Sequence, residues 1–575
     1  MMENIKEIPY GIANFVEVAE QNMYYVDKTM YLPLLEKQPR NLFFIRPRRF
    51  GKSIFLSMLR AYYDIAQKEK FQKRFGNLWI GSRPTPLQGK FQVVYLDFSR
   101  ASGGSGSLEE NFNNYCGMVM DLFGKVYEPY YFPGFAQKME EQPDFVSKLN
   151  YLNLHAAESG MRLYLIIDEY DNFTNIVLNE QGKDIYHALT HASGFYREIF
   201  KKFKGMFERI FMTGVSPVTL DDLTSGFNIG TNYSLSPKFN EMTGFTEEEV
   251  REMLDYYRSV LPFNHTTDEL IKVMKPWYDN YCFAVKSYGK TTMYNSVMVL
   301  NFISNYIDNE YDIPDSMVET NIRIDYDKMR MLIRHDKEFA HDASIIQQLV
   351  TQGFVIGTLN ENFPAERIND PDNFLSLLFY FGMVTIDGTY DGETKFIIPN
   401  EVVRDQMYTY LLDTYKENDL VYDRYSKGKL ESKLAYHGEY KPYFEYIADC
   451  LKKYSSQRDK QKGEAFVHGF TLAMTSQNKF YRPISELDND GGYADIFLSP
   501  LCDIYKDMVD SYIIELKYCK SQTTDEQVKK LFEEASAQIS RYADSDMVRE
   551  AVKTTKLHKL VVIYRGAEMV ACEEI

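Results

Sequence analysis

Short apolar runs alternate with amphipathic segments over residues 1 to about 235, and this alternation limits the possible folds most. The apolar runs are Asn41–Ile45, Phe91–Phe98, Leu163–Ile167 and Ile210–Gly214. The intervening segments include Ser53–Tyr63 and Asp184–Lys204, which have helical periodicity. Strands that are apolar throughout are buried on both faces, and their alternation with helices is typical of a parallel α/β sheet. We therefore predict an α/β multidomain protein whose first domain, 1–235, is a parallel sheet core.

The rest of the chain has a different character. Thr246-Glu-Glu-Glu249 is a capping box that opens a helix, so residues 236–345 are predicted to form a helical lid. Residues 346–410 contain apolar helix and strand segments in the order of a winged helix. The charged residues 411–434 are predicted to be a connecting helix or linker, and 435–575 a small terminal α/β domain.

Composition narrows the class of protein. The 575 residues carry a net charge of −17, so contact with nucleic acid requires a local basic surface. The six cysteines include no C-x-x-C pair, which argues against structural zinc and disulfides. The amino terminus lacks a signal-peptide core, and no apolar run reaches the roughly 18 residues of a membrane span. These features predict a cytoplasmic protein without membrane contact.

The strand Asn41–Ile45 runs into a candidate phosphate loop that ends in Gly51-Lys52-Ser53. Such a loop supplies backbone N–H groups, a lysine for the β- and γ-phosphates of ATP and a hydroxyl for Mg²⁺. The first glycine of the G-x-x-x-x-G-K-[ST] pattern is replaced by Arg46, so the motif is degenerate. Either Arg46 and Arg48 bind phosphate directly, or they form a solvated basic patch.

A second strand ends in the acidic pair Asp168-Glu169. In an ATPase, one carboxylate at this position helps to hold Mg²⁺, and the other polarises the attacking water. An apolar strand that ends in Asp-Glu is common by itself. Its position after a Gly-Lys-Ser loop in an α/β pattern predicts that Ser53 and Asp168 hold Mg²⁺ and that Glu169 polarises the water.

The terminal domain carries a different set of charged residues. Asp495 lies in one apolar segment, and Glu515 and Lys517 lie in the next. The two residues of the second segment leave the same face of a strand, because side chains alternate along it. Carboxylates that hold Mg²⁺ or Mn²⁺, together with a lysine, are the set used for metal-dependent phosphodiester cleavage. A structural salt-bridge cluster at the end of a sheet is the alternative.

Several motifs together resemble one bacterial family. They are Tyr25-Val-Asp-Lys-Thr29, Arg46-Pro-Arg-Arg-Phe-Gly-Lys-Ser53, Ile166-Ile-Asp-Glu-Tyr170, Thr213-Gly-Val-Ser-Pro217 and Trp277-Tyr-Asp-Asn-Tyr-Cys-Phe283. The chain is similar to the bacterial AAA-ATPase-like proteins, many of which carry a C-terminal PD-(D/E)xK nuclease-like domain. The resemblance implies a P-loop core of the ASCE type, with a lid and a winged helix. It also implies that Thr213 senses the γ-phosphate and that Asp27 and Lys28 lie near the nucleotide base or the loop, although Thr213 could be a plain exit from a strand.

The same resemblance implies further residues in the nuclease-like domain. Glu464 matches the acidic residue on the first helix of that superfamily, and Gln538 matches its Q-I-x-x-Y pattern. His468 lies four residues after Glu464 on the same helical face, and we favour a packing role for it.

Two functions follow from this pattern. The first is an ATP-regulated, Mg²⁺-dependent nuclease that acts on DNA, with RNA as the second choice. The alternative is a nucleotide-gated signalling or binding protein whose nuclease-like domain only binds a partner. Whether ATP is hydrolysed, whether the nuclease-like site is active and whether the chain forms a homo-oligomer are left open by the sequence.

Overall fold

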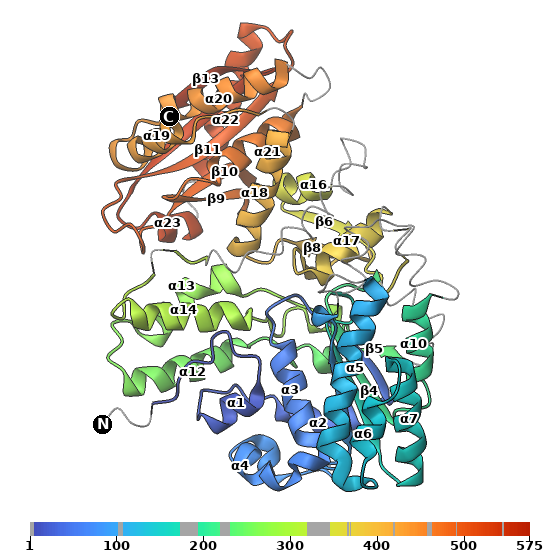
Figure 1. The fold of residues 1–575 in the computed structure, drawn as a ribbon. Helices are drawn as coiled ribbons and strands as arrows, with labels where there is room; N and C mark the ends of the chain where they lie inside the picture. Colours follow the sequence, from blue (N-terminus) through green and yellow to red (C-terminus); the bar gives the residue numbers. More distant parts are fainter. Residues whose placement is uncertain are drawn as a thin grey trace. The chain divides into compact units, whose positions relative to one another are not determined.

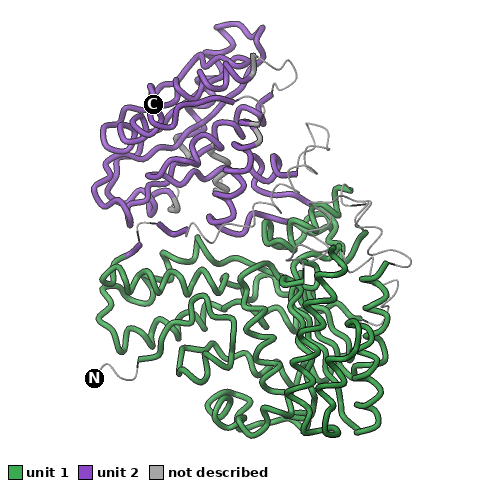
Figure 2. Tube along the Cα trace, viewed as in Figure 1, with its two compact units in different colours: residues 1–312, 319–323, 357–395 green, residues 313–318, 324–356, 396–575 purple. Residues whose placement is uncertain are grey.

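The computed structural model describes residues 5–101, 107–172, 194–218, 230–314, 316–318, 345–364, 367, 370–417, 420–456, 463–489, 492–542 and 546–575. The chain divides into two compact units, shown in two colours in Figure 2. The first contains residues 1–312, 319–323 and 357–395, and the second contains residues 313–318, 324–356 and 396–575.

A five-stranded parallel sheet forms the core of the first unit (Figure 1). Its strands are β1 (Asn41–Ile45), β2 (Gln92–Asp97), β3 (Leu163–Asp168), β4 (Arg209–Gly214) and β5 (Thr231–Asn232). They lie in the order β2-β3-β4-β1-β5. One strand, β4, therefore separates β1, which precedes the phosphate loop, from β3, which ends in the acidic pair. This order is that of an ASCE-type core, so the predicted fold class is confirmed.

Helices surround this sheet, and aromatic side chains fill part of the space between them. They are α1 (Phe15–Glu20), α2 (Leu32–Glu36), α3 (Lys52–Tyr63), α4 (Phe71–Phe75), α5 (Leu108–Tyr127), α6 (Phe135–Glu140), α7 (Phe145–Glu158) and α10 (Phe195–Phe203). Tyr62 and Tyr63 of α3 are buried against Phe75, Phe91 and Tyr164. The predicted helix over 184–204 is seen as α10, and its first residues, 184–193, lie outside the described residues.

A group of helices follows the sheet in the first unit. They are α12 (Glu247–Val260), α13 (Thr267–Tyr278) and α14 (Ser296–Asp308). The expected capping box opens α12: the Thr246 N–H donates to Glu249 Oε2 at 2.8 Å, and the Glu249 N–H donates to Thr246 Oγ1 at 3.2 Å. The helical content expected for 236–345 is present in these helices. Residues 319–344 of that range lie outside the described residues.

The segment expected to be a winged helix has the predicted order of elements. These are α16 (Ile345–Gln352), β6 (Phe354–Gly357), α17 (Pro371–Tyr380), β7 (Thr385–Tyr390) and β8 (Glu393–Ile397), with the strands in the order β6-β8-β7. The boundary between the two units passes through this segment. Residues 346–410 are therefore not a separate compact unit.

The region 411–434, predicted to be a connecting helix or linker, is mainly helical and packed. Residues of this range belong to α18 (Glu401–Glu417) and α19 (Arg424–His437), which are part of the second unit. Tyr415 is buried against the rings of Tyr454 and Phe470. Lys427 and Glu431 form a buried ion pair one helical turn apart. The charges that suggested a linker are therefore in part a buried pair and in part the outer surface of packed helices.

The second unit contains an antiparallel and parallel mixed sheet in the order β13-β12-β11-β10-β9. Its strands are β9 (Tyr481–Asn489), β10 (Gly492–Pro500), β11 (Asp510–Cys519), β12 (Lys556–Arg565) and β13 (Glu568–Glu574). The helices α20 (Tyr440–Ser456) and α21 (Glu464–Thr475) precede the sheet, and α22 (Asp525–Tyr542) and α23 (Asp546–Val552) connect β11 to the parallel strand β12. None of the helices within the described ranges has the length and apolarity to cross a bilayer.

Candidate functional site

The phosphate loop turns sharply between β1 and α3. Arg49 and Gly51 both have a positive φ, of 69° and 77°, which is the left-handed region. An added Cβ at Gly51 would meet only ordinary contacts, so the backbone conformation is what favours glycine there. These turns let α3 begin at Lys52 directly after the loop. The N-terminus of α3 thus lies at the loop, which is the arrangement that attracts an anion.

Lys52 lies within the loop. Its ammonium donates hydrogen bonds to the carbonyl oxygens of Arg46 at 3.1 Å and Pro47 at 2.9 Å. Burial lowers the pKa of Lys52, while the charges of Glu169 and Asp168 act in the opposite direction. The lysine therefore lies at the position predicted for a phosphate-binding cation, and the backbone of its own loop holds it there.

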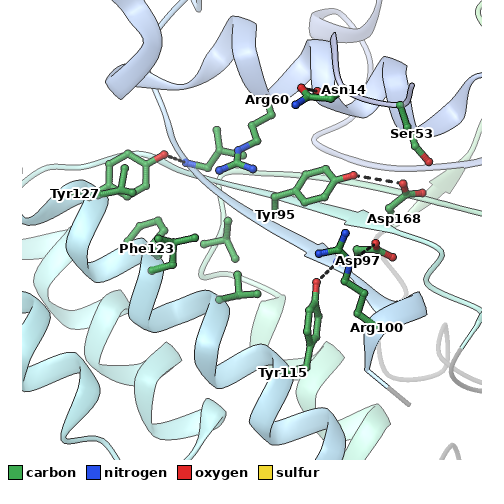
Figure 3. A pocket seen from close by; sticks show the side chains of 17 residues that line it. Asn14, Ser53, Arg60, Tyr95, Asp97, Arg100, Tyr115, Phe123, Tyr127 and Asp168 are labelled. Carbon is green, nitrogen blue, oxygen red and sulfur yellow. Dashed lines mark hydrogen bonds and ion pairs between the residues drawn. The ribbon is translucent and has the colours of Figure 1, made fainter. Parts of the chain in front are cut away.

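The structure brings Ser53 and Asp168 together, as the sequence predicted. The two side chains face each other across the edge of the sheet in Figure 3. Asp168 is buried and accepts hydrogen bonds from the Tyr95 hydroxyl at 3.3 Å and the Glu169 N–H at 3.0 Å. Burial raises the pKa of Asp168 to about 6, and a hydrogen bond from Ser53 partly opposes this rise. A hydroxyl and a carboxylate are oxygen donors of the kind that Mg²⁺ prefers.

Glu169 occupies a strained backbone position next to Asp168, with φ at 50°. The turn is fixed on both sides, because the Tyr170 N–H donates to the Thr213 carbonyl at 3.1 Å and Asp171 accepts from the Val215 and Ser216 N–H groups at 3.1 and 2.7 Å. Sequence reasoning missed Asp171, which holds the end of β4 beside the acidic pair. One signal for Asp171 in the sequence is its position two residues after Glu169. The other is the Gly-Val-Ser stretch at the end of β4.

Thr213 lies at the end of β4, but its hydroxyl is bonded within the sheet. It donates to the Phe44 carbonyl of β1 at 2.6 Å, and the side chain is buried. This contact connects the two central strands. It agrees with the interpretation of Thr213 as part of a strand exit, and the role of γ-phosphate sensor stays a prediction.

Asp27 and Lys28 have protein partners for their charged groups. Asp27 accepts from the N–H and hydroxyl of Thr29 at 2.8 and 2.6 Å and from the Trp79 N–H at 2.6 Å. The Lys28 ammonium contacts both Glu249 carboxylate oxygens, at 2.6 and 2.7 Å, and the Glu241 carbonyl at 2.9 Å. These contacts fix the amino-terminal segment and connect it to α12, and the position of the two residues near the nucleotide base or the loop stays a prediction.

The two arginines of the loop differ in burial. Arg48 is half-buried, whereas the Arg46 side chain is almost fully buried and donates to backbone carbonyls. Arg46 is therefore not part of a solvated basic patch, and its hydrogen bonds do not leave the guanidinium aimed at a phosphate. Arg46 was misjudged because a charged residue next to a phosphate loop suggests an anion ligand, and only tertiary packing shows that it is buried.

A cavity of about 550 Å³ adjoins Ser53 and Asp168 (Figure 3). Its walls come from β2, α3 and α5, with Asp97 and Arg100 near the acidic edge and Leu122 and Phe123 at the apolar end. Tyr115 and Tyr127 of α5 accept hydrogen bonds from the N–H groups of Asp97 at 2.9 Å and Val93 at 3.0 Å. The one sequence feature that indicates this cavity is Asp97, which ends β2 as Asp168 ends β3.

In the second unit, Glu515 and Lys517 are brought together on β11. Lys517 Nζ lies 2.7 Å from Glu515 Oε1, and the glutamate side chain is only 1% exposed. Ile496 of β10 pairs with Ile514 of β11 in antiparallel register. Continuing that register by one residue brings the backbone of Asp495 beside that of Glu515. The side chain of Asp495 lies outside the described part of the chain. The predicted hairpin proximity therefore holds for the backbone.

The remaining nuclease-like candidates lie on helices. Glu464 is the first residue of α21 and is exposed, whereas His468 is buried within the same helix. Gln538 is an exposed residue of α22, next to the buried Ile539. The burial of His468 agrees with the packing role that we favoured. Within the part of the chain that the structure describes, no three or more His, Cys, Asp or Glu side chains are grouped to hold a metal ion.

One further carboxylate was missed. Ser485 and Leu487 of β9 pair with Ile496 and Ala494 of β10, so the backbone of Glu486 lies beside that of Asp495.

Two family models match this chain. Residues 9–224 match the AAA-ATPase-like family, described as predicted AAA-ATPase, and residues 462–574 match the PD-(D/E)XK nuclease superfamily. Both assignments made from the sequence motifs are thereby confirmed. The first matched range contains the loop with Lys52 and Ser53. The second contains the β10–β11 hairpin with Glu515 and Lys517.

Known relatives are distant. A curated protein from Azotobacter chroococcum mcd 1, described as an uncharacterized protein in the vnfD 5′ region, is 27% identical over 283 residues. The match covers 48% of each chain, so this protein spans about half the length of that relative. The Aeropyrum pernix ORC2 structure (ADPNP-ADP complexes) covers 67% of this chain and 93% of its own at 12% identity, with a TM-score of 0.31. The Aeropyrum pernix ORC1 structure in complex with DNA covers 67% and 92% at 9% identity, with a TM-score of 0.25.

Proposed function

We propose that this chain, with its AAA-ATPase-like and PD-(D/E)XK nuclease superfamily domains, is an ATP-regulated nuclease that cleaves DNA with Mg²⁺ or Mn²⁺. The observation that supports it most is the meeting of Lys52, Ser53, Asp168 and Glu169 at one edge of the first sheet. ATP-related and nuclease-like functions agree with both family matches. The nucleotide dependence, the choice of DNA over RNA and the metal are our inference.

The N-terminal residues fit a nucleotide with its metal. The ammonium of Lys52 would contact the β- and γ-phosphates, and Ser53 and Asp168 would hold Mg²⁺ through oxygen atoms. Mg²⁺ would neutralise part of the negative charge on the phosphates. The fixed, strained position of Glu169 is suited to orienting and polarising a water for hydrolysis. Glu169→Gln in the full chain should therefore keep ATP binding, measured by calorimetry, and lose phosphate release.

The second site also fits a metal-dependent cleavage. Glu515, with Asp495 beside it on the neighbouring strand, would supply carboxylate oxygens to the metal, and Lys517 would position the water and stabilise negative charge. The metal would neutralise charge at the scissile phosphate. Glu464 and Gln538 are proposed to lie at the edge of this site.

A cleavage assay tests the proposal. Its substrates are supercoiled plasmid, single-stranded DNA and RNA, and each is incubated with Mg²⁺ or Mn²⁺, with and without ATP. Each of Asp495→Ala, Glu515→Ala and Lys517→Ala should lower the cleavage rate by a factor of about 10³ and leave ATP binding unchanged. Lys530→Ala, on the outer surface of α22, is the matched control. A full chain that cuts no nucleic acid with any of these metals would refute the nuclease half of the proposal.

One observation favours the alternative of a nucleotide-gated binding protein. The Lys517–Glu515 contact at 2.7 Å already compensates both charges without a metal, as a structural ion pair does. If ATP changes the affinity for DNA in a protein that never cuts it, this second function becomes the better one.

A further inference from the structure

Arg46 lies where the first glycine of an ordinary phosphate loop would stand, and both terminal nitrogens of its guanidinium are bonded to backbone carbonyl oxygens. Its Nη1 donates to the carbonyl oxygens of Ile45 at 3.0 Å and Ser234 at 2.6 Å, and its Nη2 donates to the Phe239 carbonyl at 3.1 Å. The residue is 1% exposed. A buried guanidinium with three carbonyl partners cannot turn outward to a phosphate without breaking all three contacts.

Two aromatic rings cover the faces of this guanidinium. Its carbon lies 4.3 Å from the centre of the Phe44 ring, on β1, and 4.2 Å from the centre of the Phe283 ring. Phe283 ends the Trp277–Phe283 motif that follows α13. A planar cation between two aromatic faces gains attraction from both, and the gain is largest where water is excluded. Arg46 thus connects the strand before the loop to the segment that follows α13.

The same segment covers the rest of the loop. Phe50 packs edge-on against Tyr281 and Phe283, with ring centres 4.8 and 5.2 Å apart. At the start of α14, the Ser296 hydroxyl donates to the Arg49 carbonyl at 3.0 Å, and the Val297 N–H donates to the same oxygen at 3.3 Å. The loop is therefore held from outside by residues 281–297, along much of its length.

Arg46 also contacts the candidate phosphate ligand through its backbone. The Lys52 ammonium donates to the Arg46 carbonyl at 3.1 Å and to the neighbouring Pro47 carbonyl at 2.9 Å. A shift of residue 46 would therefore move the acceptors that orient Lys52. The side chain of Arg46 fixes the loop, and the main chain of Arg46 fixes the lysine.

We propose that Arg46 is a positioning residue for ATP binding, which acts through a guanidinium clamp formed by Phe44, Arg46 and Phe283. The clamp takes over the shaping role that a glycine turn has in ordinary phosphate loops, and it couples the loop to the segment after α13. The inference rests on the proposed ATP binding and deepens it: the site's affinity for ATP depends on a residue that never touches the nucleotide.

The test measures ATP affinity by calorimetry and thermal unfolding without nucleotide, on the full chain, for Arg46→Met, Phe283→Leu and Phe283→Tyr. Arg46→Met and Phe283→Leu should each weaken ATP binding roughly tenfold, because loss of a desolvated cation–π contact has that size. Phe283→Tyr keeps an aromatic ring at this position, so its affinity for ATP should be close to that of the wild type.

A matched control separates positioning from simple loss of stability. Arg162 stacks on the Phe91 ring at 4.4 Å and pairs with Glu208, but it precedes β3, at the other end of the sheet from the loop. Arg162→Met should lower the unfolding temperature and leave the affinity for ATP unchanged.

The possible results are distinct. Folded Arg46→Met or Phe283→Leu protein that binds ATP as well as the wild type would overturn the clamp. If Arg46→Met does not fold, Phe283→Leu decides, because it leaves the guanidinium and its hydrogen bonds in place. Equal weakening by Phe283→Leu and Phe283→Tyr would also overturn it. A wild-type chain that binds no ATP would refute the proposed function itself, and the clamp with it.

Discussion

The two candidate sites hold their lysines in opposite ways. Lys52, in the phosphate loop, donates to backbone carbonyls, and its neighbouring carboxylate, Asp168, is bonded instead to Tyr95 and Ser53. Lys517, in the nuclease-like hairpin, pairs directly with Glu515. In the phosphate loop, Lys52 and Asp168 have different bonding partners, so the site can accept the ATP phosphates and Mg²⁺ together. In the second site, the lysine contacts one oxygen of the carboxylate that is proposed to hold the metal.

Lys52→Ala should have the largest effect on the first site. It removes the one ammonium that the loop's carbonyls hold at the phosphate position, and ATP affinity should fall by a factor of about 100 or more. Calorimetric titration of the full chain measures it. Lys125→Ala, which breaks an exposed ion pair with Glu140, is the control and should bind normally. Equal affinity for Lys52→Ala and the wild type would remove the contrast between the two sites.

The pH dependence of Mg²⁺-assisted ATP binding is expected to be the next largest effect. The pKa of Asp168 is raised to about 6 by burial, so the carboxyl becomes protonated below that pH and loses its capacity to hold the metal. The Mg²⁺-dependent part of the affinity should fall about tenfold for each pH unit below about 6.

The free energy of unfolding, measured without metal, should show the opposite dependence on pH. A raised pKa means that the folded chain binds a proton more tightly than the unfolded chain does. The contribution of Asp168 is therefore fully present below about pH 4 and is lost as pH rises through about 6. Titrations at several pH values, with Asp168→Asn for comparison, measure both trends. A wild-type profile identical to that of Asp168→Asn would show that this carboxyl is not the group responsible.

The last of these predictions concerns the stability of the second unit and the ion pair of the second site. Glu515→Leu alone strands the Lys517 ammonium and should cost about 3 kcal/mol of unfolding free energy, whereas Glu515→Leu with Lys517→Met should be within about 1 kcal/mol of the wild type. Denaturant unfolding of the full chain, followed in the second unit, measures both. A double variant that is as unstable as the single one would mean that the two charges do not compensate each other.

Much of the nucleotide site could be predicted from the sequence. The strands around Gly51-Lys52-Ser53 and Asp168-Glu169 are apolar throughout, and such strands have few alternatives to a buried parallel sheet. Once the sheet is parallel, the residues that follow its strands meet at one edge, so the proximity of Ser53 and Asp168 follows from local pattern alone.

The failures concern charged residues whose partners are distant in sequence. Arg46 contacts Ser234 and Phe283, and Lys28 contacts Glu249, so more than 180 residues separate each pair. Composition could not show that these charges are buried. The helices over 411–434 were missed for a related reason: Lys427 and Glu431 are only four residues apart, but their burial depends on packing that composition does not show.

The regulation of the nuclease by ATP is the central claim, and one comparison tests it most directly. The rate of plasmid cleavage with Mg²⁺ is measured with and without ATP, for the wild-type chain and for Lys52→Ala. Coupling between two sites on one chain changes such a rate by a factor of about 5 or more. We predict that ATP changes the wild-type rate by at least that factor and leaves the Lys52→Ala rate unchanged. A wild-type rate that is the same with and without ATP would contradict the account.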